Sequence, residues 1–182
     1  SLEDVKDWFR ANYGPANAIL VLAGDVDVAT AKTLVAKYFG DIPAGRRIAN
    51  PAVDIPTLPA RKEIVLKDRV ATTRLYRYWT VPGLNDKDSV PLGIFASALG
   101  GLASSRLDNE LVKKEQLAVA VTASMQDFEQ LGFFEVTADV KPGVDPARVA
   151  ARLDAIIADF LAKGPSADEV QRVATREVAG RN

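Results

Sequence analysis

The side chains that most often carry out chemistry in enzymes are sparse in this sequence of 182 residues. It contains no histidine and no cysteine. This composition excludes a Ser-His-Asp triad, an imidazole acid or base and a thiol nucleophile. Catalytic zinc is usually held by histidine with a carboxylate, and structural zinc by cysteine, so we expect no metal site within the chain. We therefore expect the chain alone to be catalytically inactive, with no catalytic residue and no cofactor of its own.

The hydroxyl and carboxylate groups that remain allow two interpretations. Ser104 and Ser105 could act as nucleophiles, but without histidine or an evident lysine partner a role in capping a helix is favoured. Asp25 and Asp27 follow an apolar run and could bind a cation. Capping of the following helix is the more common use of aspartates at such a position.

The glycine pair Gly100-Gly101 is the remaining candidate site. It could form a flexible loop that faces a substrate, or one glycine could end the preceding helix in a left-handed conformation. The sequence leaves both alternatives open.

Composition also limits the classes of partner. The 23 basic and 24 acidic side chains nearly balance and form no basic stripe, which argues against nucleic-acid binding. No apolar run approaches the roughly 20 residues that span a bilayer, so we expect no membrane span. The N-terminal residues do not have the pattern of a secretory signal.

Hydrophobic spacing predicts two helices and one strand in the first quarter of the chain. Ser1 can cap a helix with apolar residues at helical spacing, and Asp27 can cap a second helix that ends at Gly40. Between them, the continuous apolar run Ala18 to Ala23 predicts a strand that is buried on both faces.

A proline-rich stretch then separates two regions of different character. Four prolines fall between residues 43 and 60, where no hydrophobic period is present. Such segments act as extended, semi-stiff linkers. We therefore expect three parts: residues 1–43, a linker at 44–60, and a domain over 61–182.

The third part groups strands and helices without strict alternation. Strands are predicted at 62–66 and 72–81, and helices from 86 or 88 to 99 and from 104 or 105 to 114. A hairpin of strands 117–125 and 134–140 follows, then a helix at 146–163 and one from Ser166, where Ser166-x-x-Glu169 has the spacing of a capping box. Alternation places Leu117, Val119 and Val121 on one face of the first hairpin strand. This grouping predicts an α+β fold, with a largely antiparallel sheet and helices packed on one face.

Several short motifs, taken in order, resemble the M16 zinc-peptidase family, which includes pitrilysin, insulinase and mitochondrial processing peptidase. Across nearly the whole chain, the resemblance rests on Asp4-x-x-x-Trp8-Phe9-x-x-x-Tyr13-Gly14-Pro15-x-Asn17, Gly24-Asp25-Val26, Lys37 to Pro43, Val81-Pro82, Leu99-Gly100-Gly101, Ser104 to Leu107 and Lys114-Glu115-Gln116-Leu117. The resemblance implies that residues 1–43 are the end of a preceding M16-type domain and that 61–182 are most of a second, non-metal domain.

The metal motif of the family is absent from the chain. M16 peptidases bind zinc through an inverted H-x-x-E-H motif on a helix, which the resemblance would place upstream of Ser1. It therefore implies zinc in the parent protein and none here. The implied partners are an upstream metal-binding domain or a partner subunit, together with a peptide or protein substrate.

A second family feature is also missing. Active members hold the substrate with an Arg and a Tyr seven residues apart in a non-metal domain. By the resemblance, these positions are Val112 and Val119, which have no side-chain hydrogen-bond donor.

Two roles follow from the resemblance and one from the residues alone. The chain is expected to be the non-catalytic domain of a zinc metalloendopeptidase that completes a peptide-binding chamber. The alternatives are a non-catalytic structural subunit of a heteromeric M16 peptidase, or a generic α+β protein-interaction domain. The resemblance to bacterial members suggests a periplasmic location.

Overall fold

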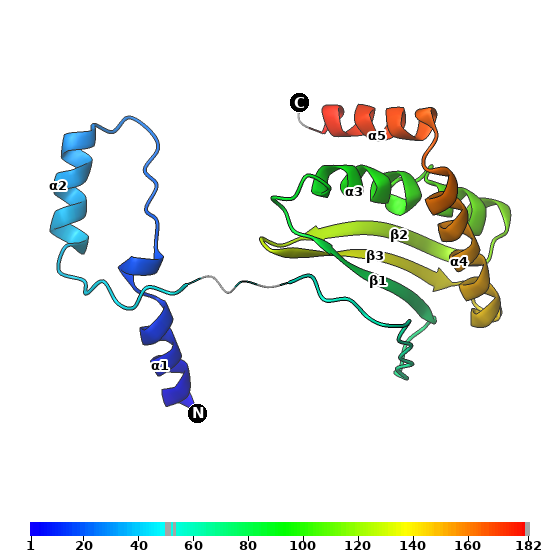
Figure 1. Cartoon of the computed structure of the whole chain (residues 1–182), viewed down its shortest axis with the longest axis horizontal. Coiled ribbons are helices and arrows are strands. Elements are labelled where there is room, and N and C mark those ends of the chain that lie inside the picture. Colours follow the sequence, from blue (N-terminus) through cyan, green and yellow to red (C-terminus); the bar gives the residue numbers. More distant parts are fainter. Residues whose placement is uncertain (50–51, 53, 181–182) are drawn as a thin grey trace. The chain divides into compact units, whose positions relative to one another are not determined.

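The computed structural model describes residues 1–49, 52 and 54–180 of the chain. It divides into two compact units, Ser1–Ala52 and Val53–Asn182, which we call unit 1 and unit 2 (Figure 1). Each unit is described here by itself.

Unit 1 contains helices but no sheet among its described residues. Its elements are the α-helix α1 (Leu2–Asn12), the short 3-10 helix η1 (Pro15–Asn17) and the α-helix α2 (Val28–Phe39). Ser1 and Asp4 form a reciprocal capping box at the start of α1, and Asp27 caps α2 by accepting hydrogen bonds from two backbone N–H groups. Both predicted caps are confirmed.

The predicted buried strand at Ala18 to Ala23 is wrong for the chain by itself. The segment is extended, but it pairs with no strand within the described residues. Ile19 is 92% exposed, and no residue of the described part of unit 1 is buried. The physical reason is that a strand needs a neighbour to satisfy its backbone groups, and the described residues of unit 1 form no other strand.

Unit 2 is built on a three-stranded antiparallel sheet. Its strands are β1 (Arg74–Pro82), β2 (Ala118–Asp127) and β3 (Leu131–Val140), in the spatial order β1-β3-β2. The hairpin of β2 and β3 is confirmed, with its turn after Asp127. The predicted strand at residues 62–66 is not formed; its three apolar residues are exposed to solvent.

A β-bulge changes the predicted facing of β2. Ala118 pairs with Val140 and Ala120 with Asp139, so Val119 is the extra residue without a partner. Ala118 is therefore buried, while Val119 is 51% exposed. The expectation that Val119 shares a face with Leu117 and Val121 is wrong because the bulge shifts the alternation by one residue.

Helical segments cover one face of this sheet (Figure 1). They are α3 (Ser89–Ala96), two π-helical segments named η2 (Ser97–Gly101) and η3 (Asp108–Lys114), and α4 (Pro146–Lys163). The last helix, α5 (Ala167–Ala179), packs on α3 and η2. The core between helices and sheet includes residues with no exposed surface, among them Leu99, Leu111, Val136, Leu153 and Phe160. The predicted α+β class, with helices on one face of an antiparallel sheet, is confirmed.

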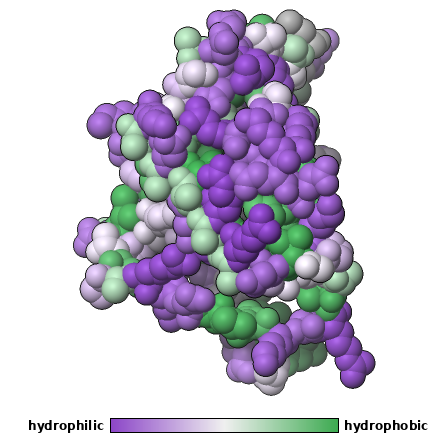
Figure 2. Space-filling view, turned by 90° about the vertical axis from the view of Figure 1, so that its right-hand side faces the viewer, coloured by the Kyte–Doolittle hydropathy of each residue, from purple (hydrophilic) through white to green (hydrophobic). Residues whose placement is uncertain are grey.

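The side of unit 2 on which α4 lies has a largely polar surface (Figure 2). Seen from the right-hand side of Figure 1, hydrophilic residues in purple cover most of the visible face, with separate green patches between them (Figure 2). This pattern agrees with the amphipathic spacing of α4, whose five buried residues all belong to the core.

One predicted cap is not made. The Ser105 side chain is buried, and its hydroxyl has no hydrogen-bond partner among the described residues. Helical geometry begins at Arg106 without a side-chain cap, and the segment widens into η3. The serine is held in the packing of the core instead of at a solvent-facing helix end.

Candidate functional site

The face of the sheet opposite the helices is partly exposed within unit 2; at one end of β1, Thr80 Oγ1 donates to the Pro56 carbonyl at 2.6 Å. Along β1, Leu75 and Val81 pack against the core, whereas Tyr76 and Tyr78 point to the other side. The two tyrosines are 47% and 57% exposed. Their rings are stacked, with centroids 5.8 Å apart and planes 9° from parallel. We call the surface formed by these tyrosines and their cross-strand neighbours the open face.

Cross-strand pairs order the polar groups of the open face. Tyr78 lies opposite Glu135, and its hydrogen bond with this carboxylate raises the pKa of Tyr78 to about 12. Tyr76 lies opposite Thr137, whose hydroxyl is 2.7 Å from that of Thr122 on β2. These hydroxyl groups form a row across all three strands, and each can donate or accept a hydrogen bond.

An ion pair between Arg74 on β1 and Asp139 on β3 lies two residues along the strands from this row. Arg74 Nε and Nη2 donate to the two carboxylate oxygens of Asp139 at 2.5 and 2.8 Å, in the bidentate geometry that arginine favours. The hydrogen bonds with Arg74 hold the pKa of Asp139 below its usual range. The open face therefore combines two stacked tyrosine rings, the threonine hydroxyl groups and the Arg74–Asp139 ion pair.

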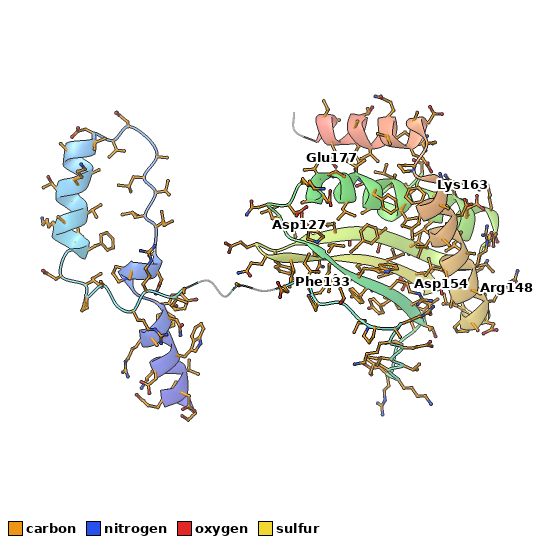
Figure 3. All side chains as sticks on the ribbon, in the orientation of Figure 1. Asp127, Phe133, Arg148, Asp154, Lys163 and Glu177 are labelled. Carbon is orange, nitrogen blue, oxygen red and sulfur yellow. The ribbon has the colours of Figure 1, made fainter. Side chains whose placement is uncertain are left out.

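On the helical side of the same strand, Arg77 holds β1 to α4. Arg77 Nε and Nη2 donate to the two carboxylate oxygens of Asp154 at 2.7 and 3.1 Å, and Arg61 Nη1 adds a third hydrogen bond at 3.0 Å. Figure 3 labels Asp154 on α4 beside the sheet. Burial raises the pKa of Asp154, but the hydrogen bonds from both arginines outweigh it and lower the pKa overall.

We expect Asp154→Asn to lower the free energy of unfolding at pH 7 by roughly 1–2 kcal/mol, because two charge-assisted contacts in a half-exposed setting are lost. A carboxylate with a lowered pKa in the folded state contributes stability above its unfolded pKa and loses it as pH falls through the folded value. The difference between wild type and variant should therefore shrink below about pH 4. Urea denaturation at pH 7 and pH 3 measures this change. Asp68→Asn, in an exposed loop, is the matched control; equal losses in both variants at both pH values would contradict the assignment.

Gly100 and Gly101 lie in η2 and do not have the left-handed conformation of a helix-ending glycine. Gly100 is buried, and a Cβ atom there would lie 2.5 Å from the backbone nitrogen of Ala123 on β2. The glycine thus allows η2 to approach the sheet closely. Gly101 is at the surface, and its carbonyl accepts a hydrogen bond from Arg176 at 2.8 Å. A role of this pair in contacting substrate stays a prediction.

Val112 lies within η3, and Val119 is the second residue of β2. Val112 packs against the core, whereas Val119 projects from the bulge. The structure therefore places these two positions in different environments, although both have aliphatic side chains.

This difference predicts unequal tolerance to larger polar side chains. We expect Val119→Tyr to change the free energy of unfolding by less than about 0.5 kcal/mol, because the side chain is exposed. Val112→Arg should cost about 1–2 kcal/mol, because a charged group would replace a core contact. Chemical denaturation of both variants measures the contrast. A Val119→Tyr variant as unstable as Val112→Arg would refute the outward placement of Val119.

Sequence reasoning missed the ion pairs that hold the helical layer together. Arg106 Nε and Nη2 donate to the two carboxylate oxygens of Glu169 at 3.0 and 2.6 Å, and its guanidinium lies 4.7 Å from the centre of the Phe160 ring. The capping box Ser166-x-x-Glu169, which the structure confirms, indicated only the local role of Glu169. No spacing signal connects residues 63 positions apart.

A family model described as the peptidase M16 inactive domain matches residues 1–176. The chain belongs to the peptidase M16 inactive-domain family. The resemblance seen in its sequence motifs is confirmed.

The relatives of this M16 domain include proteins named as zinc proteases. It is 28% identical over 170 residues to the zinc protease PqqE of Helicobacter pylori, a match covering 90% of this chain and 37% of the relative. It is 30% identical over 145 residues to an uncharacterized zinc protease of Streptomyces coelicolor, covering 76% of this chain and 31% of the relative. The M16 domain thus spans about a third of the length of these curated relatives.

Solved structures show the same fold. A protease from Helicobacter pylori superposes with a TM-score of 0.78 at 25% identity, covering 99% of this chain and 44% of that one. A peptidase M16 inactive domain from Pseudomonas fluorescens superposes with a TM-score of 0.82 at 21% identity, covering 100% of this chain and 43% of that one. The likeness to the second structure concerns the fold alone.

The M16 domain does not provide ligands for the zinc that these relatives' names imply. It has no histidine or cysteine, and its described residues include no cluster of three acidic side chains suited to a metal. Within the same residues, no helix is both long and apolar enough to cross a bilayer.

Proposed function

We propose that this chain is the non-catalytic part of an M16 zinc metallopeptidase and that the open face lines part of its peptide-binding chamber. The observation that carries this proposal is the contrast between the two sides of the sheet. One side is covered by helices and forms the core, whereas the other presents the exposed side chains of Tyr76, Tyr78 and Thr122.

The chemistry of the open face suits an unfolded peptide. Stacked tyrosines offer a rigid apolar surface with polar ends, so they can contact side chains of several kinds. The Thr122 side chain is exposed, and its hydroxyl can pair with peptide N–H or C=O groups, whereas Thr137 is buried and bonds to Thr122. The pKa of Tyr78, raised to about 12, keeps its hydroxyl protonated at neutral pH, which suits a hydrogen-bonding role.

The division of the chain supports a proposal about its partners. Residues 1–43 would complete a preceding M16-type domain, 44–60 would connect the two, and 61–182 would form most of the second domain. Support comes from unit 1, where large apolar side chains of α1 and α2 and the extended segment Ala18 to Ala23 are exposed. Zinc would be held by the preceding domain or by a partner subunit, because this chain has no histidine or cysteine to bind it.

The test compares peptide cleavage in the longer protein that carries this chain together with its zinc-binding part. We expect the double variant Tyr76→Ser/Tyr78→Ser to raise KM for an internally quenched peptide at least about fivefold, which corresponds to about 1 kcal/mol of binding. The zinc content should stay unchanged. Leu161→Ser is the matched control, because Leu161 is an equally exposed residue on α4.

An unchanged KM in the tyrosine variant would overturn the chamber assignment for the open face. A parent protein that lacks H-x-x-E-H and cleaves no peptide would instead favour the partner-subunit alternative. In that case, the same KM comparison would be made after adding the catalytic companion.

A further inference from the structure

A second surface with unused polar groups lies between α5 and the loop that follows η2. It is a shallow hollow of about 460 Å³, lined by Gly101, Leu102, Ala103, Ser104, Arg172 and Arg176. We call it the arginine hollow. Because α5 and η2 both belong to the helical layer, the hollow is separate from the open face of the sheet.

The residues that line the arginine hollow include two arginines and no carboxylate, although Asp168 lies one turn before Arg172 on α5. Arg172 and Arg176 are four residues apart on α5, so they project from the same face of the helix, where like charges repel. Arg176 Nη1 donates to the Gly101 carbonyl at 2.8 Å, which positions this guanidinium and leaves its other N–H groups available. Arg172 makes no side-chain hydrogen bond or ion pair within the described part of the chain.

A neighbouring hollow of about 410 Å³ also contains basic side chains, but they are paired with carboxylates. Its arginine and lysine side chains are already paired: Arg106 with Glu169, Lys114 with Glu110 and Lys113 with Asp108. These internal pairs satisfy the charges of that hollow. Of the two hollows, only the arginine hollow is lined by guanidinium groups that form no ion pair among the described residues.

The walls of the arginine hollow are held in place by packing. Gly100 sits against Ala123 of β2, which fixes the end of η2 and the start of the loop. On the other side, Val173 is buried beside Arg172 and anchors α5 to the core. A site whose walls are already positioned loses less conformational entropy when a ligand binds.

We propose that the arginine hollow binds the carboxylate of an acidic peptide segment. A guanidinium presents two parallel N–H groups that match the two oxygens of a carboxylate. The opposite wall, Leu102 and Ala103 with their main chain, can contact the aliphatic part of a peptide residue. The carboxylate can come from an Asp or Glu side chain or from a peptide C-terminus, and both present the same group.

This inference goes beyond the chamber proposal and does not depend on it, because it concerns the helical side of unit 2. An acidic peptide held there would dock a neighbouring polypeptide instead of a substrate on the open face. Failure of one proposal leaves the other intact, since Arg172 and the tyrosines of the open face belong to different surfaces.

The test is an NMR titration of the ¹⁵N-labelled 182-residue chain with short peptides at fixed ionic strength. One peptide ends in a free carboxylate, a second carries an internal Asp with an amidated C-terminus, and a third has neither group. We expect one or both acidic peptides to shift the Gly101 to Ser104 amides and the arginine Nε–H signals, whereas the neutral peptide should not. The acidic peptide that binds identifies the source of the carboxylate.

Two arginine variants distinguish specific binding at the arginine hollow from non-specific electrostatic attraction of the acidic peptide. Arg172→Gln should weaken acidic-peptide binding at least tenfold. Arg148→Gln removes an equally exposed arginine of α4, away from α5 in Figure 3, and should have no effect. The proposal is overturned if both variants weaken binding equally, if neither acidic peptide shifts the loop amides, or if inorganic phosphate displaces the acidic peptide at equal concentration.

Discussion

Replacing Arg106 with methionine is expected to lower the free energy of unfolding by about 2–4 kcal/mol, because a partly buried carboxylate is left without its partner. The Glu169 side chain is 10% exposed and that of Arg106 is 22% exposed, so water replaces the lost hydrogen bonds poorly. The substitution also removes the guanidinium from the Phe160 ring. Methionine retains most of the apolar stem of arginine, so the loss reports mainly on the charged group.

The pH dependence of this variant distinguishes a lost ion pair from simple loss of packing. Burial raises the pKa of Glu169, but hydrogen bonds from Arg106 and Ser166 outweigh it and lower the pKa overall. Without Arg106 the pKa of Glu169 should rise in the folded state. The variant should therefore recover part of its deficit relative to wild type as pH falls below about 4, where the carboxylate becomes protonated.

Chemical denaturation of two further variants measures how much of the loss in the free energy of unfolding is due to the unpaired charge. The double variant Arg106→Met/Glu169→Met should be less destabilised than the sum of the single variants, because no charge is left unpaired. Lys163→Met removes an exposed partner of Asp159 and should cost less than about 1 kcal/mol. An Arg106→Met variant that loses no more stability than Lys163→Met would show that the buried pair is unimportant.

Local signals explain which parts of the fold could be predicted from the sequence. The helix caps at Ser1, Asp27 and Ser166 depend on residues within three positions of each other, and all three are confirmed. The β2–β3 hairpin likewise joins strands that are neighbours in the chain, with alternating apolar residues that mark the inner face.

Long-range pairing explains most of what the sequence did not predict. The run Ala18 to Ala23 has the composition of a strand, but a strand forms only where a partner supplies hydrogen bonds, and unit 1 contains none among its described residues. Arg77 and Asp154 are 77 positions apart, so their contact depends on where α4 packs against the sheet. No local sequence pattern around Arg77 or Asp154 predicts that the two side chains are in contact.

Small departures from regular helix and strand geometry also changed where candidate site residues lie. One extra residue in β2 moves Val119 from the predicted inner face to the surface. At the end of α3 the helix widens into η2, and the close approach of Gly100 to β2 replaces the expected helix-ending role of a glycine. Alternation and capping rules assume regular elements, so they fail at such points.

The glycine pair provides the second large expected effect. We expect Gly100→Ala to lower the free energy of unfolding by about 1–3 kcal/mol, because the new methyl group overpacks the contact between η2 and the sheet. Its Cβ would lie 2.5 Å from the Ala123 backbone nitrogen and 2.8 Å from the Ala123 Cβ, and backbone cannot move away as a flexible side chain could. Thermal and chemical denaturation measure the loss.

Gly101→Ala is the matched control one residue later in the same turn. Its Cβ would meet nothing closer than the Ser97 side chain at 3.4 Å, so we expect a change of less than about 0.5 kcal/mol. The two glycines therefore separate two explanations for the pair. If packing against β2 requires glycine, only the variant at position 100 is destabilised. If the pair serves a mobile loop that contacts substrate, both variants should keep their stability, and both should alter peptide cleavage in the longer protein.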